Sequence, residues 1–262
     1  MFVFAVVAVL LGSCKNDLSD EVIETSHAKT LAQYLFLDVF RQTLAVVPDY
    51  VANGSVNGAS ITISSSSSFN ENTYPKIVTV DYGSVNQLDE MGINRKGKIL
   101  VTILSDQITK GDFKISFEKF YLNDTRMLGE ISSSYVGSAS GDDYNLTLVD
   151  TSKITNGNGT MSFGADFTVK MTSGKQTFDV YDDLYTVSEK SWGQDFQGRS
   201  YTSSSAEAYI VDFSCRWLIT SGMSEINPND IQLQTLDMGN GGCEGVVTAE
   251  VKKDKFVSFQ IK

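Results

Sequence analysis

Apolar and polar residues alternate along most of the chain beyond residue 53. Because successive side chains of a β-strand point to opposite faces, this alternation predicts strands with one buried and one solvated face. Clusters of Gly, Ser, Thr, Asn and Asp separate the runs as turns would, and no helical pattern lies between them. The pattern predicts a mostly β fold, an antiparallel meander that forms either a sandwich or a long curled sheet. The clearest runs are Ile61/Ile63, Val78/Val80/Tyr82, Ile99/Val101/Ile103, Phe113/Ile115/Phe117, Tyr144/Leu146/Leu148, Phe167/Val169/Met171, Tyr209/Val211/Phe213 and Val257/Phe259/Ile261.

One segment before these runs has a different pattern. Residues 27–47 contain neither Gly nor Pro and end just before Pro48, which predicts an N-terminal helix packed on the sheet. Its apolar side chains are not confined to one stripe, which suggests burial on more than one side. Packing in the concave face of a sheet and packing over one sheet edge both fit this pattern. The apolar residues are Leu31, Leu35, Phe36, Val39, Phe40 and Leu44.

The chain opens with an apolar run of ten residues, Phe2 to Leu11, followed by Gly12, Ser13 and Cys14. The run has the length of a secretory signal core and is about half of what a transmembrane helix needs. Leu-Gly-Ser-Cys resembles the lipobox that lipoprotein signal peptidase reads. We therefore expect a signal peptide at 1–13, lipidation (palmitate among the acyl chains) at Cys14, a lipidated tether at 14–26 and a single β domain at 27–262. No Lys or Arg precedes the run, which is compatible with a start codon upstream of Met1.

The net charge of the chain limits the classes of partner that it can bind. The chain carries a formal net charge of -11 and has no basic run that could neutralise phosphates. Because Lys and Arg supply most of the affinity for nucleic acid, we expect no nucleic-acid partner. The expected membrane contact is through the lipid anchor.

Two cysteines, Cys215 and Cys243, remain after Cys14. In an oxidising compartment they are most simply read as a disulfide. The alternative is a pair of buried free thiols.

Few residues suggest catalytic chemistry. The single histidine, His27, is expected as a solvated residue in the first turn of the predicted helix, which argues against a Ser-His-Asp site and a histidine-rich metal site. The acidic segment of Asp179, Asp182 and Asp183 is read as a solvated turn in preference to a Ca²⁺ site, because no calcium-loop spacing is present. We expect no metal and no cofactor. The serine runs 64–68 and 203–205 are read as solvated loops or strand ends.

The segment Lys190 to Tyr201 gathers aromatic and polar side chains among Gly and Ser, and it is read as a loop. Exposed aromatic side chains beside polar groups are typical of sites that bind sugars and peptides. The alternative is that Trp192 and Phe196 fold back to cover the core. The candidate ligand-binding residues are Trp192, Phe196, Arg199 and Tyr201.

Two segments resemble uncharacterised outer-membrane lipoproteins of the Bacteroidota. The first runs from Tyr74-Pro75-Lys76 to Asp81-Tyr82-Gly83 and on to Arg95–Ile99; the second joins Cys215 to Asp237-Met238-Gly239 and Cys243. This chain has Met238 where the family usually has an aromatic residue and Glu244 where Asp is usual. The resemblance implies an exported β domain on the outer membrane and no particular reaction.

These observations favour a membrane-anchored lipoprotein, facing either the cell surface or the periplasm, with a non-enzymatic binding, adhesion or envelope-assembly domain. Its ligand would be a glycan or a protein. The alternative is a carbohydrate-active hydrolase, in which two carboxylates would face each other across a cleft.

Overall fold

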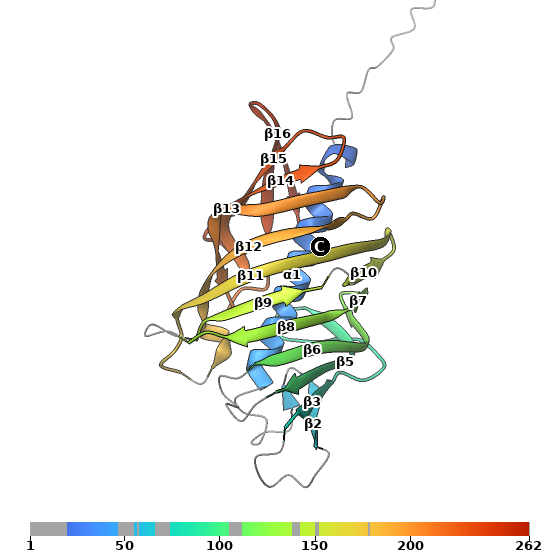
Figure 1. The fold of residues 1–262 in the computed structure, drawn as a ribbon, viewed down its shortest axis with the longest axis vertical. Coiled ribbons are helices and arrows are strands. Elements are labelled where there is room, and N and C mark those ends of the chain that lie inside the picture. The colour runs from blue at the N-terminus through green and yellow to red at the C-terminus, as the bar shows by residue number, and fades with distance from the viewer. Residues whose placement is uncertain are drawn as a thin grey trace, which may run out of the picture.

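The fold is one large antiparallel sheet curled around one long helix (Figure 1). A computed structural model describes residues 20–46, 55–56, 58–65, 74–104, 112–137, 142–149, 152–177 and 179–261. The predicted signal peptide, Cys14 and residues 15–19 lie outside these ranges. The helices are α1 (Asp20–Val46) and the short 3-10 helix η1 (Val180–Asp182). The strands are β1 (Ser55–Val56), β2 (Ala59–Ser65), β3 (Lys76–Asp81), β4 (Gln87–Leu88), β5 (Asn94–Ile103), β6 (Phe113–Leu122), β7 (Thr125–Leu128), β8 (Glu130–Tyr135), β9 (Tyr144–Leu148), β10 (Lys153–Asn156), β11 (Gly159–Ser173), β12 (Leu184–Gln194), β13 (Ser200–Asp212), β14 (Ile219–Pro228), β15 (Gln234–Asn240), β16 (Val246–Lys252) and β17 (Lys255–Gln260).

The sheet is the meander that the alternation predicts. From β11 to β17 each strand pairs antiparallel with the next strand in the chain. At the other end, β2 pairs with β3, β3 with β5 and β5 with β6. Two pairs of shorter strands lie between β6 and β11. Along one part of these long strands the order is β6–β7–β10–β11, and along the other part it is β6–β8–β9–β11. All eight of the clearest runs lie in strands or directly at their ends, and the mostly β prediction is confirmed.

The helix lies in the concave face of the sheet and not over one sheet edge, the other arrangement that its sequence allows. From Thr25 to Val46 its side chains are buried apart from the half-buried His27 and Ala45. Phe40, for example, has ring contacts with Phe113, Tyr144 and Phe213, which lie on three different parts of the sheet. A helix surrounded in this way needs apolar side chains on several faces, as its sequence has.

The helix also begins earlier than predicted. It starts at Asp20, so residues 20–26 are helical and the predicted tether to residue 26 is wrong in that part. Thr25 donates to Asp195 at 2.6 Å and Ser26 donates to Gln234 at 2.5 Å, which fixes this turn against the sheet. His27 therefore lies inside the helix, not in its first turn, and its ring meets the edge of Phe259 at 5.3 Å. Polar contacts with distant strands hold a segment that looks like a linker in sequence.

Charged side chains of the helix and of the sheet form ion pairs inside the core. Asp38 on α1 accepts from Arg95 on β5 at 2.8 Å and also pairs with Arg41. Burial alone would raise the pKa of Asp38, but the Arg95 and Arg41 guanidiniums outweigh it and hold that pKa below its ordinary value. Arg41 Nη1 also donates to the carbonyl of Phe213 at 2.9 Å. These bonds set the position of the helix relative to strands on both sides.

The two remaining cysteines form the predicted disulfide. Cys215 and Cys243 are joined, with 5.2 Å between their Cα atoms. The bond links the turn after β13 to the connection between β15 and β16. In the described part of the chain, no helix combines the length and the apolar composition that a bilayer span needs.

Candidate functional site

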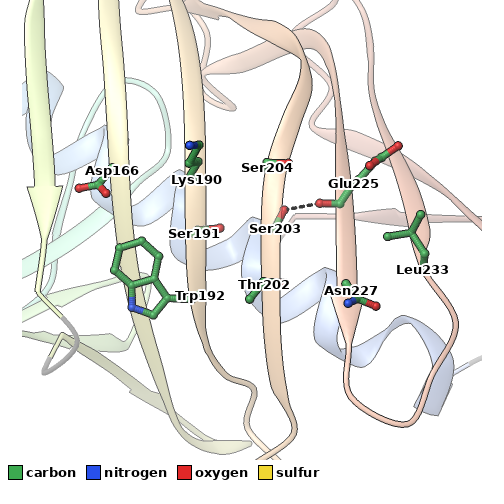
Figure 2. A pocket seen from close by; sticks show the side chains of 10 residues that line it. All are labelled: Asp166, Lys190, Ser191, Trp192, Thr202, Ser203, Ser204, Glu225, Asn227 and Leu233. Carbon is green, nitrogen blue, oxygen red and sulfur yellow. Dashed lines mark hydrogen bonds between the residues drawn. The ribbon is translucent and has the colours of Figure 1, made fainter.

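The candidate site is a groove of about 580 Å³ on the outer, solvent-facing side of strands β11 to β14 (Figure 2). Strand alternation places its side chains, since the opposite face of the same strands packs on α1. The groove is lined by Asp166, Lys190, Ser191, Trp192, Thr202, Ser203, Ser204, Glu225, Asn227 and Leu233.

The pairing register of strands β11 to β14 explains why the outer surface is hollow here. One cross-strand row joins Asp166, Lys190, Ser204 and Glu225, and the next joins Gly164, Trp192, Thr202 and Asn227. In both rows the small hydroxyl residue is on β13, and longer side chains stand on β12 and β14 at either side. The floor therefore follows β13, and the walls are β12 and β14 with Leu233, which is 52% exposed.

Trp192 gives the groove its aromatic surface. Its cross-strand partner on β11 is Gly164, which has no side chain to compete for the space beside the indole. Figure 2 shows the indole extending from β12 toward β11. The ring is half-buried, so one part of it packs on the sheet and another part remains accessible. Such a surface beside hydroxyl and amide groups can stack against an apolar ring face while the polar groups bind hydroxyls.

The two carboxylates of the groove are held apart. Asp166 and Glu225 are separated by three strand spacings, or about 14 Å between backbones at about 4.8 Å per strand. Asp166 also accepts a hydrogen bond from Thr147 at 3.0 Å. Glycosidases place their two carboxyl groups about 5 to 10 Å apart. The backbones that carry these two carboxylates are therefore farther apart than the carboxyl groups of a glycosidase.

Only one of the four predicted ligand-binding residues lies in this groove. The segment from Lys190 to Tyr201, predicted to be a loop, is a hairpin: β12 continues to Gln194, β13 begins at Ser200, and residues 195–199 form the turn. Because Tyr201 pairs with Gly193 and not with Trp192, it points to the opposite face and is 3% exposed. Phe196 packs on the edge of the core. The structure thus separates Trp192 from Phe196, Arg199 and Tyr201.

Arg199 belongs to the contact between the hairpin and the helix. Its Nη1 lies 3.7 Å from Asp195 Oδ2 and 3.4 Å from the hydroxyl of Thr25. Asp195 also accepts from the backbone N–H groups of Gln197 and Arg199, which closes the turn. This arrangement holds the first turns of α1 and leaves Arg199 directed away from the groove.

The serine run 203–205 is part of the same strand, so its reading as a loop or strand end is wrong. Ser203 is buried and donates to the carbonyl of Glu225 at 2.8 Å. Ser204 points outward as part of the groove floor. Short hydroxyl side chains suit both positions, because one supports the neighbouring strand and the other leaves the groove open.

A second hollow of about 460 Å³ lies over β3, β5 and β6. Its charges are largely matched: Lys98 pairs with Asp81 at 3.3 Å, and Lys96 pairs with Asp124 at 3.4 Å. The amine of Lys96 lies 4.7 Å from the ring centre of Tyr121, which covers that aromatic face. This hollow combines two surface ion pairs with an aromatic ring that a lysine covers on one face.

The acidic segment is a turn, as predicted, but one carboxyl in it is buried. Asp179 caps η1 by accepting from the N–H of Tyr181, and Asp182 accepts from Thr177 at 2.7 Å. Burial raises the pKa of Asp183 to about 6, although a hydrogen bond from Tyr185 acts in the opposite direction. Within the described ranges, no three His, Cys, Asp or Glu residues are placed to hold a metal ion.

Comparisons with known proteins add no identification. No protein-family model, curated protein or solved structure matches this chain. The groove and the sequence of the N-terminal segment are therefore the features that bear on function.

Proposed function

We propose that the protein is a lipid-anchored, non-enzymatic binding domain of the outer membrane, and that its groove over β11 to β14 binds a glycan. The observation that carries this proposal is the placement of Trp192 beside a floor and wall of Thr202, Ser204 and Asn227. An indole face matches the apolar face of a pyranose ring, and the hydroxyl and amide groups match its equatorial hydroxyls.

The shape of the groove favours a chain over a single sugar. Outward side chains of β13 lie about 6.6 Å apart along the strand, at about 3.3 Å per residue. Thr202 and Ser204 in the groove, with Ser200 beyond its edge on the same face of β13, therefore offer a line of hydroxyl groups longer than one sugar ring. Asp166, Lys190 and Glu225 supply charges of both signs, so the ligand we expect is a neutral polysaccharide.

Binding without cleavage follows from the wide spacing of Asp166 and Glu225. A glycosidase needs a proton donor and a second carboxylate on either side of one bond. Among the described residues that line the groove, the two carboxylates stand on strands that are three spacings apart, with Lys190 and Ser204 between them. We therefore place binding ahead of hydrolysis.

The anchor rests on the sequence around Cys14 and on the likeness to Bacteroidota lipoproteins. Several acyl chains at one cysteine bind a bilayer durably, at about 0.8 kcal/mol per buried CH₂. In cells fed labelled palmitate, wild-type protein is expected to carry the label and to pellet with membranes. The Cys14→Ser variant is expected to do neither, and a variant that still did both would refute the anchor.

The groove is tested by a glycan-array screen of the full chain, followed by affinity measurements on each hit. Trp192→Ala is expected to weaken binding at least about ten-fold, which corresponds to about 1.4 kcal/mol. Tyr121→Ala is the matched control, because it removes an aromatic side chain from the same outer face outside the groove. Equal affinity of wild type and Trp192→Ala would contradict the proposed site, as would recovery of shortened glycan after incubation.

A further inference from the structure

The hairpin between β16 and β17 carries the densest group of exposed lysines in the described chain. Lys252, Lys253 and Lys255 lie within four residues, with Asp254 among them and Glu250 opposite Phe256 on the paired strand. The next residue, Phe256, is 63% exposed. An exposed aromatic ring beside three amines is unusual for a chain whose net charge is -11.

This hairpin lies at the end of the molecule where the helix begins. Ser26 in the second turn of α1 bonds to Gln234 at the start of β15. Gln232, two residues earlier, donates to the carbonyl of Val251 at the end of β16. Figure 1 shows β16 beside the N-terminal end of α1. The three lysines and Phe256 are therefore close to the point where the described chain starts.

The length of the preceding chain limits how far this end can be from an anchor. Five residues lie between Cys14 and Asp20, the first residue of α1, so six residue-to-residue steps join the two. A fully extended chain spans at most about 3.6 Å per residue, or about 20 Å here. With Cys14 in a bilayer, the end that bears the hairpin is held next to the headgroups, while the far end of the sheet is not.

We propose that the β16–β17 hairpin is a second membrane contact, in which Phe256 enters the headgroup boundary of a bilayer and the three lysines bind lipid phosphates. Aromatic rings lie favourably at this depth, and the long lysine side chains reach phosphates while their CH₂ groups cover apolar surface. Lysines near an anionic lipid surface are attracted to it electrostatically. The contact fixes the orientation of the anchored body. It rests on the proposed anchor and is independent of any ligand in the groove.

The test uses the full lipidated chain in vesicles of phosphatidylethanolamine and phosphatidylglycerol, with a spin label at one introduced cysteine. Phe256→Cys reports the hairpin. Leu88→Cys is the matched control, because Leu88 is 67% exposed and lies on β4, away from the hairpin. We expect the ratio of oxygen to nickel-chelate collisions to be several-fold higher at position 256 than at position 88.

Charge reversal then tests the lysines. Lys252→Glu, Lys253→Glu and Lys255→Glu together are expected to reduce the ratio at position 256 to that at position 88. The same three changes at Lys153, Lys170 and Lys175 are expected to leave it unchanged. Equal ratios at 256 and 88 in the anchored, labelled proteins that keep all three lysines would overturn the hairpin contact alone. A chain that does not stay with the vesicles would overturn the proposed anchor together with it.

Discussion

At the scale of single residues, the fold lowers the pKa of one buried carboxyl group and raises the pKa of another. Asp38 is matched by Arg41 and Arg95, so it is held ionised. Asp183 receives a hydroxyl from Tyr185 at 3.0 Å and has acidic neighbours in place of a guanidinium, so burial raises its pKa to about 6. The first residue stabilises the fold at neutral pH, and the second opposes it.

The raised pKa of Asp183 predicts a pH dependence of stability. Because the pKa in the folded state lies above the ordinary value of 3.8, the carboxyl favours the fold fully below about pH 4 and loses this contribution as the pH rises through about 6. Asp183→Asn should therefore raise Tm at pH 7.5 by about 2–4 °C, as about 1 kcal/mol does in a protein of this size. At pH 4 the two proteins should melt together. Thermal unfolding at both pH values measures this, and a variant that melts lower at pH 7.5 would contradict it.

The candidate site shows how far single residues can be predicted from sequence. Trp192 was identified as a candidate because an aromatic ring stands there among polar residues, and it does line the groove. Tyr201 belongs to the same stretch but faces the core, because it pairs with Gly193 and not with Trp192. The face of the sheet on which a side chain lies depends on strand register. Register comes from pairing between distant residues and leaves no local signal in the sequence. The floor residues Thr202 and Ser204 were missed for the same reason, because buried Ser203 between them is also a small hydroxyl residue and the stretch shows no apolar–polar alternation.

At the scale of elements, polar contacts between helix and strand place α1 inside the sheet. Lys29 on α1 lies 2.9 Å from Glu189 on β12, and both side chains are fully buried. Burial alone would lower the pKa of Lys29, but Glu189 and Tyr209 outweigh it and raise that pKa. Ser191 donates to the same carboxylate at 2.7 Å. The pair fixes which part of the helix meets β12.

Removing one charge of the Lys29–Glu189 pair should destabilise the protein more than removing both charges. Lys29→Met leaves the Glu189 carboxylate buried without its cation, for which we expect a loss of about 3–5 kcal/mol in the free energy of unfolding. Lys29→Met with Glu189→Gln leaves no buried charge and should recover a large part of the loss. Urea unfolding of both variants tests this, and a double variant less stable than Lys29→Met would count against a specific pair.

The predicted boundaries of elements failed where long-range contacts decide them. Residues 20–26 have the polar composition of a tether, yet Thr25 and Ser26 bond to Asp195 and Gln234, each about 170 residues or more away. The strands with a regular apolar alternation were predicted correctly, because that signal is local. The choice between helix and linker at residue 20 depends on contacts that composition does not show.

At the scale of the whole molecule, alternation left open a sandwich or a curled sheet, and the helix accounts for the observed form. A helix with apolar side chains on several faces and buried ions on others must be surrounded, which a meander can do by curling. The outer face then becomes the accessible surface, and the groove lies on it. The start of α1 and the β16–β17 hairpin lie together at one end, so the proposed anchor and the proposed hairpin contact would act on the same side of the molecule.

The most direct test of the proposed function is the environment of Trp192 when a ligand binds. In a Trp217→Phe background, Trp192 is the only tryptophan of the chain. Titration with a glycan from the screen is predicted to shift its emission to shorter wavelength and to protect it from acrylamide quenching, because the indole becomes covered. A glycan that binds with the emission and quenching of Trp192 unchanged would contradict binding in this groove.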